Sequence, residues 1–218
     1  MQLSGRLARV HINSALAFEK FAAPLVPADA HVLEIGPDGH PSTYRRAVQV
    51  PVTWVTADLA DQAGTWATDR TSAEIRMPSE YELPVEDETF DAVVSGNVIE
   101  HVRQPWRWMA ELARVTKPGG LVMTVAPVTW VYHPAPIDCY RYYPDGLDAI
   151  CEFAGLKPEV SWWGALEPRQ YKRTYPGVGL EWYDWQRYPR VKKALARVGL
   201  WQVPIAYDIV SVARKPAS

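Results

Sequence analysis

Hydrophobic positions along this chain alternate between short unbroken runs and helical spacing. Apolar runs of strand length, each stopped by turn residues, predict strands at residues 31–35, 52–57, 73–77, 90–95, 120–126, 160–163 and 207–213. Helical spacing with proline or glycine boundaries predicts helices at residues 5–23, 41–48, 105–116 and 144–154. Strands that alternate with helices favour an α/β fold with a doubly wound, mostly parallel sheet of seven strands.

A length of 218 residues fits one domain, which we expect to have three parts. Residues 1–28 form an N-terminal helical cap, residues 30–155 a ligand-binding core, and residues 156–218 the last strands with an insertion at about 164–190. In a doubly wound sheet, ligands bind at the carboxyl ends of the strands, near the switch in strand order. The residues that follow each strand are therefore the candidates for a site.

Charge and cysteine content exclude several classes of partner. A net charge of −2 lacks the broad positive field of a general nucleic-acid binder, so no nucleic-acid partner is predicted. Cys139 and Cys151 have no CxxC or metal-ligand spacing, which predicts neither a disulfide framework nor a metal site and favours a reducing cytoplasm. The polar N-terminus and the absence of a long apolar run predict no secretion signal and no membrane partner.

The first strand ends in the turn Glu34-Ile35-Gly36-Pro37-Asp38-Gly39. Gly36 allows a ligand to approach the backbone closely, and Glu34 can accept hydrogen bonds from an ammonium group. Asp58, at the end of the second strand, can bind both hydroxyls of a ribose. A dinucleotide site would show G-x-G-x-x-G here, so a nucleoside without phosphates fits the turn better.

Two later segments of the sequence resemble the signature of a known family. One contains Leu83-Pro84, Phe90-Asp91 and Glu100-His101, and the other is the run at residues 112–120 that ends in Lys-Pro-Gly-Gly. Together they resemble the signature of class I S-adenosylmethionine-dependent methyltransferases, in a branch similar to methyltransferase type 11. The resemblance covers roughly residues 30 to 155. It implies the Rossmann-like methyltransferase fold, S-adenosyl-L-methionine as the cofactor, and methyl transfer as the activity.

The resemblance also implies a role for each matched position along the cofactor. The residues matched to the methionine part are Glu34, Gly36, Pro37, Asp38 and Gly39, and those matched to the ribose are Asp58 and Leu59. The adenine side is matched by Ser79 and Glu80, and the sulfonium side by Ser95, Asn97 and Val98. Asp38 is a departure, because the family usually has a second glycine there. Its charge would repel the methionine carboxylate unless it faces the ammonium group or solvent.

The segment at residues 132–144 resembles a run in the same branch that combines His-Pro, an aspartate and an aromatic-arginine pair. We expect His133 to be the catalytic base, with Asp138 orienting it and His101 as the second candidate. The alternative is a proline-stiffened structural loop in which Asp138 pairs with Arg141. The expected acceptor-binding residues are Tyr140, Arg141, Trp163 and Trp182.

The stretch at residues 162–185 is dense in tryptophan, tyrosine, proline and arginine. It fits either a lid over an acceptor pocket or a dimer interface, so both a monomer and a homodimer remain open.

Methyl transfer to a small-molecule acceptor is the leading functional hypothesis, with a hydroxyl oxygen of a secondary or cell-surface metabolite as the target. Alternatives are small-molecule N-methylation, a non-catalytic S-adenosylmethionine-binding regulatory protein, which only Asp38 favours, and, third, a nicotinamide oxidoreductase. Methylation of a nucleic-acid base is disfavoured, because Ser95-Gly96-Asn97-Val98 stands where the Asn/Asp-Pro-Pro-Tyr/Phe motif would be.

Overall fold

A computed structural model describes residues 12–59, 73–130, 132–134, 137–164, 166 and 207–217. Most of the predicted insertion at about 164–190, including Trp182, lies outside the described residues, as does the start of the predicted N-terminal helix. Cys139 and Cys151 are both free thiols. Among the helices described, none combines the length and the apolar character needed to cross a membrane.

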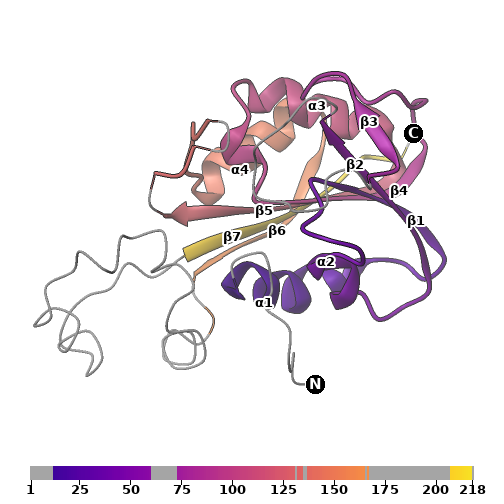
Figure 1. Ribbon diagram of the computed structural model, residues 1–218, viewed down its shortest axis with the longest axis horizontal. Coiled ribbons are helices and arrows are strands. Elements are labelled where there is room, and N and C mark those ends of the chain that lie inside the picture. Colours follow the sequence, from indigo (N-terminus) through magenta and orange to yellow (C-terminus); the bar gives the residue numbers. More distant parts are fainter. Residues whose placement is uncertain are drawn as a thin grey trace, which may run out of the picture.

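Seven strands form one sheet in the order β3-β2-β1-β4-β5-β7-β6 (Figure 1). Their bounds are β1 (Ala30–Ile35), β2 (Val52–Leu59), β3 (Ile75–Met77), β4 (Phe90–Gly96), β5 (Thr116–Thr129), β6 (Lys157–Gly164) and β7 (Tyr207–Arg214). The first five strands pair in parallel, whereas β7 is antiparallel to both of its neighbours. The strand order reverses between β1 and β4, where a doubly wound sheet binds its ligands.

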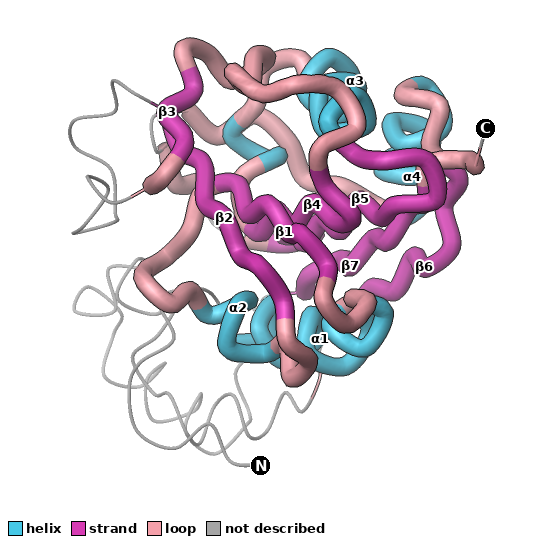
Figure 2. Tube along the Cα trace, turned by 90° about the vertical axis from the view of Figure 1, so that its right-hand side faces the viewer, coloured by secondary structure: helices cyan, strands magenta, loops and turns pink. Residues whose placement is uncertain are grey.

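Helices cover both faces of the sheet (Figures 1 and 2). The bounds of the α-helices are α1 (Ile12–Phe21), α2 (Thr43–Ala47), α3 (Pro105–Val115) and α4 (Pro144–Phe153). Two short 3₁₀ helices are η1 (Ala23–Leu25) and η3 (Ile99–His101). Helices α1 and α2 lie on one face, and α3 and α4 lie on the other. The predicted doubly wound architecture is confirmed.

Successive side chains of β1 point alternately to the two faces of the sheet. Val32 packs in the core under α1 and α2, whereas Leu33 and Ile35 pack in the core under α3 and α4. Because successive side chains of a strand point to opposite faces, Glu34 points to the same face as Val32. The one carboxylate of β1 is therefore buried on the α1–α2 side, at the carboxyl end of the strand.

Several element boundaries differ from the sequence prediction by two to four residues, and two of the differences have a clear structural cause. Helix α2 begins at Thr43, after Ser42, whose hydroxyl oxygen accepts the Arg45 amide at 3.0 Å, so Pro41 precedes the cap instead of lying in the first turn. Strand β5 starts earlier than predicted, at Thr116, because Phe90 pairs with Thr116 before a register shift. The Lys-Pro-Gly-Gly turn thus forms an irregular start of the strand.

Candidate active site

Glu34 lies buried at the end of β1 and is held by two donors from different elements. Ser42 Oγ, at the cap of α2, donates to Glu34 Oε2 at 2.5 Å, and Trp54 Nε1, on β2, donates to the same oxygen at 2.7 Å. Among the described residues, Oε1 has no hydrogen-bond partner. Burial raises the pKa of Glu34 to about 7, although the hydrogen bonds from Ser42 and Trp54 oppose this rise. One carboxylate oxygen is fixed, and the other can accept a ligand donor.

Gly36 marks the closest approach between the two sides of the switch point. Its φ is +69°, and a Cβ at this position would lie 2.7 Å from Val98 Cγ2. A side chain there would be strained by the backbone and would also clash with the loop after β4. The turn after β1 and the loop after β4 are therefore in contact, as expected of a single ligand site. Pro37 is buried and Gly39 half-buried in the same turn.

Asp38 bonds back to the first residue of α2. Its Oδ1 accepts the Thr43 amide at 2.7 Å, and its Oδ2 accepts the Thr43 hydroxyl at 2.5 Å. The carboxylate therefore stabilises the start of α2, a role that aspartate performs often and glycine cannot. This contact accounts for an aspartate where the family usually has glycine.

Asp58 and Leu59 lie beside this turn, because β2 pairs with β1 in parallel. The amide of Gly36 donates to the carbonyl of Ala57 at 2.9 Å, which places Asp58 next to the turn. Strand β3 continues the edge, with Leu59 in register with Met77. Two residues beyond this strand, Ser79 forms an isolated bridge with Glu82, and Glu80 is half-buried next to it. The edge holds these predicted cofactor residues in their expected order.

The loop after β4 is held in an unusual backbone conformation. Asn97 has a φ of +57°, its amide donates to the Val125 carbonyl at 2.8 Å, and its Oδ1 accepts the Tyr44 hydroxyl at 3.2 Å. Among the described residues, Asn97 Nδ2 and the fully buried Ser95 Oγ have no hydrogen-bond partner. Two polar atoms at the end of β4 are thus available to a ligand.

Next along the chain, η3 brings a carboxylate and an imidazole to the same edge. Glu100 is fully buried, and no described residue hydrogen-bonds either of its carboxylate oxygens. Burial raises the pKa of Glu100 to about 8. His101 Nε2 lies 3.8 Å from Glu100 Oε1, and its Nδ1 lies 2.5 Å from the Ile137 carbonyl. Burial lowers the pKa of His101, against the opposing effect of that carbonyl.

His133 joins this group from the loop after β5. Its ring meets the His101 ring edge to face, with centroids 4.9 Å apart. Asp138 Oδ2 accepts the His133 amide at 2.8 Å and lies 3.2 Å from His133 Nδ1. Arg141 binds both oxygens of Asp138, at 2.5 and 2.7 Å. Burial alone would raise the pKa of Asp138, but the hydrogen bonds from Arg141 and from the His133 amide outweigh it and lower that pKa.

Both interpretations of the 132–144 segment therefore describe real contacts. Asp138 pairs with Arg141, as the structural interpretation expected, and it also contacts His133, as the catalytic interpretation expected. The backbone amides of Cys139 and Tyr140 donate to the Glu100 carbonyl at 2.8 and 3.3 Å, which fastens this loop to η3. These contacts place Cys139 and Tyr140 beside η3.

The predicted acceptor residues are less tightly grouped. The Tyr140 hydroxyl donates to the Arg103 carbonyl at 3.0 Å, and Arg141 belongs to the histidine group described above. Trp163 is 51% exposed and contacts Tyr143, with ring centroids 6.2 Å apart. Ser42, Trp54 and Glu100 belong to the site but were not among the predicted site residues. None of the three has a distinct sequence signal: Trp54, for example, is an apolar residue of β2 that packs against the core on the α1–α2 side.

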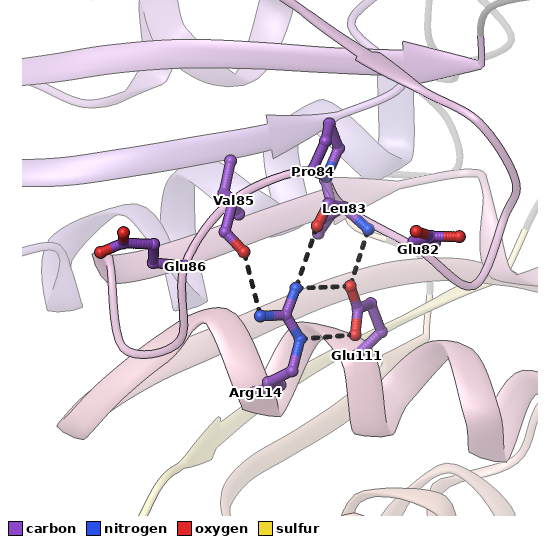
Figure 3. A pocket seen from close by; sticks show the side chains of 7 residues that line it. All are labelled: Glu82, Leu83, Pro84, Val85, Glu86, Glu111 and Arg114. Carbon is purple, nitrogen blue, oxygen red and sulfur yellow. Dashed lines mark hydrogen bonds and ion pairs between the residues drawn. The ribbon is translucent and has the colours of Figure 1, made fainter.

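A hollow of about 550 Å³ lies away from these residues, between α3 and the loop that leads into β4 (Figure 3). It is lined by Glu82, Leu83, Pro84, Val85, Glu86, Glu111 and Arg114. Arg114 donates to the carbonyls of Leu83 and Val85, each at 3.0 Å, and also pairs with Glu111. This arginine fastens the loop to α3. The loop precedes β4, so the hollow belongs to the edge of the sheet opposite the ligand edge.

The fold is a Rossmann-like sheet with an antiparallel β7, and the candidate site lies at its switch point. Residues 33–124 match the family model described as "Methyltransferase domain", so this part of the chain is similar to methyltransferases. A Mycobacterium bovis (strain BCG / Pasteur 1173P2) protein named an uncharacterized methyltransferase is 46% identical over 66 residues. Those residues are 30% of this chain and 26% of the relative, so the chain spans about a quarter of that relative's length.

Solved structures show the same fold at low sequence identity. A Burkholderia thailandensis 1,6-didemethyltoxoflavin-N1-methyltransferase, with bound 1,6-didemethyltoxoflavin and S-adenosylhomocysteine, has a TM-score of 0.58 at 13% identity. The match covers 93% of this chain and 78% of that one. The [4+2]-cyclase SpnF has a TM-score of 0.59 at 17% identity, over 94% of this chain and 80% of its own. The fold thus also occurs in a protein named for another reaction.

Proposed function

We propose that this chain transfers the methyl group of S-adenosylmethionine to a small-molecule acceptor. One observation carries the proposal: the turn with Glu34 and Gly36 contacts the loop after β4, which leads directly to His101, and the His101 ring contacts that of His133. A candidate cofactor site and a candidate proton acceptor thus occupy one edge of the sheet. The match of residues 33–124 to the methyltransferase domain and the S-adenosylhomocysteine in the Burkholderia structure support the same cofactor.

The described residues of the candidate site fit this cofactor. Glu34 Oε1, buried without a hydrogen-bond partner among the described residues, suits the ammonium group. Gly36 leaves the room that the methionine part needs, and Asp58 would hold the ribose hydroxyls. Ser79 and Glu80 would lie on the adenine side, and Ser95, Asn97 and Val98 on the sulfonium side. When bound, the cofactor supplies an electrophilic methyl group on sulfur.

The acceptor is proposed to be a hydroxyl oxygen, with His133 as its base. The oxygen forms a bond to the methyl carbon as the carbon–sulfur bond breaks, and the hydroxyl proton passes to His133. Asp138, 3.2 Å from Nδ1, orients the ring and stabilises its charged form. His101 is the second candidate, because its ring contacts that of His133. Much of the remaining catalysis is positioning of the two reactants.

Calorimetry and a transfer screen test these statements separately. Calorimetry should show binding of S-adenosylmethionine and S-adenosylhomocysteine. A panel of hydroxylated and amine-bearing small molecules, assayed with methyl-labelled cofactor, should show label transfer to a hydroxyl. Transfer confined to amines would replace oxygen by nitrogen as the target. Binding without transfer to any member of the panel would favour a non-catalytic cofactor-binding protein.

A further inference from the structure

Three side chains beside the proposed acceptor position have the composition of a metal site. Glu100 and His101 come from η3, and His133 comes from the loop after β5. Each offers one ligand atom, and these atoms all lie within 4.8 Å of one another. We propose that Glu100, His101 and His133 bind one divalent transition-metal ion of the zinc type. The cysteine spacing had predicted no metal site, because that prediction considered only ligands placed close together in sequence.

Both histidines have the second contact that metal-binding histidines use. One ring nitrogen of such a histidine binds the ion, and the other donates to a carbonyl or a carboxylate, which fixes the ring. His101 Nδ1 lies 2.5 Å from the Ile137 carbonyl, and His133 Nδ1 lies 3.2 Å from Asp138 Oδ2. The carbonyl favours a proton on Nδ1 of His101, and Asp138 favours one on Nδ1 of His133, although Arg141 Nη2 also lies 3.4 Å from that nitrogen. In this form the other nitrogen of each ring is the ligand atom.

Glu100 provides an independent observation. It is fully buried, yet neither carboxylate oxygen has a hydrogen-bond partner among the described residues. A buried carboxylate without donors is unfavourable unless it takes up a proton or a cation compensates it. The charge of Arg141 lowers the pKa of Glu100, but both terminal guanidinium nitrogens bind Asp138 and neither hydrogen-bonds Glu100. An ion between Glu100 and the two imidazoles would complete the environment of this carboxylate.

The distances and ligand types indicate which ion fits. Bonds of about 2.1 Å in a tetrahedral site place ligand atoms about 3.4 Å apart. His101 Nε2 and Glu100 Oε1 are 3.8 Å apart, and the widest separation in the group is within 4.8 Å. Side-chain movements on the order of 1 Å would close the site. Two imidazoles with one carboxylate suit zinc and its neighbours, whereas magnesium and calcium prefer oxygen ligands.

The metal site does not depend on the proposed methyl transfer, but both proposals give a role to His133. A metal-bound imidazole has no lone pair with which to accept a proton. If His133 is the base, loading the site with Zn²⁺ should inhibit transfer. If Zn²⁺ binds and transfer is faster, the metal site stands and the base assignment fails.

Calorimetry with Zn²⁺ on the chelator-treated full chain tests the proposal directly. We expect one ion per chain, and visible absorption bands of a four- or five-coordinate site when Co²⁺ is used instead. His101→Ala, His133→Ala and Glu100→Gln should each weaken Zn²⁺ binding by about 100-fold or more, since loss of an outer partner alone costs about 10–100-fold. The matched controls His40→Ala and Glu86→Gln alter exposed residues outside the group and should bind like the parent.

Binding of S-adenosylmethionine by each variant checks that the variant is folded, because the proposed cofactor residues lie outside the three ligands. X-ray absorption of the Zn²⁺-loaded parent gives a measurement that needs no variant, and it should show two imidazole ligands. The proposal is overturned if no ion binds stoichiometrically. Equal Zn²⁺ affinity in the three variants, or a spectrum without imidazole ligands, overturns it as well.

Discussion

Two buried glutamates lie on the same edge of the sheet, and their surroundings differ. Glu34, at the end of β1, accepts hydrogen bonds from Ser42 and Trp54 through one oxygen, whereas no described residue donates to either oxygen of Glu100. The donors fix Glu34 in one orientation, ready for a ligand that brings a single further donor. Glu100 requires a ligand that supplies hydrogen-bond donors or positive charge to both of its oxygens. The edge therefore has a preorganised half, which we propose for the cofactor, and a half proposed for the acceptor, in which the carboxylate of Glu100 has no hydrogen-bond donor among the described residues.

The largest expected effect is on turnover, and it comes from a change at His133 in the acceptor half. His133→Ala should lower kcat by roughly 10²–10⁴-fold, because it removes the proposed general base. The dissociation constant for S-adenosylmethionine should stay within twofold of the parent, since Glu34 and Asp58 are untouched. Steady-state kinetics at saturating acceptor and calorimetry measure the two quantities, with His40→Ala as the control. Parent-like turnover at saturation would remove His133 as the base.

The next effect comes from the other half. Glu34→Gln should weaken S-adenosylmethionine binding at pH 8 by roughly 30-fold, because a hydrogen bond to a charged group contributes about 2 kcal/mol. Glu100→Gln, the matched change in the acceptor half, should alter this affinity by less than twofold. Calorimetry on both variants gives the comparison. Equal losses in the two variants would mean that the division into halves is wrong.

A pH series sharpens the same comparison. The pKa of Glu34 is raised to about 7, so the free site is protonated below that pH and must lose a proton to bind an ammonium group. Affinity for S-adenosylmethionine should fall about tenfold for each pH unit below 7 and level off above pH 8. Glu34→Gln should abolish this slope. A slope that persists in the variant would assign the titration to another group.

Stability of the cofactor-free chain should change with pH in the opposite sense. A folded-state pKa of about 7, above the ordinary value of 4.5, means that the folded chain holds this proton more tightly than the unfolded chain does. The contribution of Glu34 to stability is therefore fully present below pH 4.5 and is lost as the pH rises through 7. Comparing thermal unfolding of the parent and Glu34→Gln across this range isolates the contribution.

The smallest effect concerns Asp38. Asp38→Gly should lower the free energy of unfolding by about 1 kcal/mol, because Thr43 loses the acceptor for its amide and hydroxyl. Cofactor affinity should change by less than threefold, since this carboxylate is engaged with α2. Asp38→Asn, which keeps an acceptor oxygen, is the control. A tenfold gain in affinity for the glycine variant would show that Asp38 opposes the methionine carboxylate.

The fold was predictable because its signals are local. Each strand is a short apolar run with turn residues after it, and the reversal of strand order follows from the class of fold. The irregular start of β5 was not predictable in this way, since Thr116 pairs with Phe90 through a register shift that only the packed sheet defines. Proline at residue 41 indicated a helix start within two residues, and the serine cap fixed it.

The site was predictable only where one segment carries it. Glu34 and Asp58 lie at the carboxyl ends of β1 and β2, and Gly36 follows β1, so a pattern along the chain selects them as candidates. The contact between His101 and His133 joins residues that are distant in sequence, and it depends on how the loop after β5 folds back onto η3. Glu100 was missed as a site residue because nothing in the sequence distinguishes a buried glutamate without donors from a solvated one.

Asn13 connects three distant parts of the chain with one side chain. From the buried face of α1, its Nδ2 donates to the Gly164 carbonyl at 3.0 Å and to Asp208 Oδ2 at 2.7 Å, and its Oδ1 accepts the Leu166 amide at 2.7 Å. Asn13 thus joins α1 to the end of β6 and the start of β7. For protein engineering, a change at this one position of the first helix would therefore affect the ends of two late strands together.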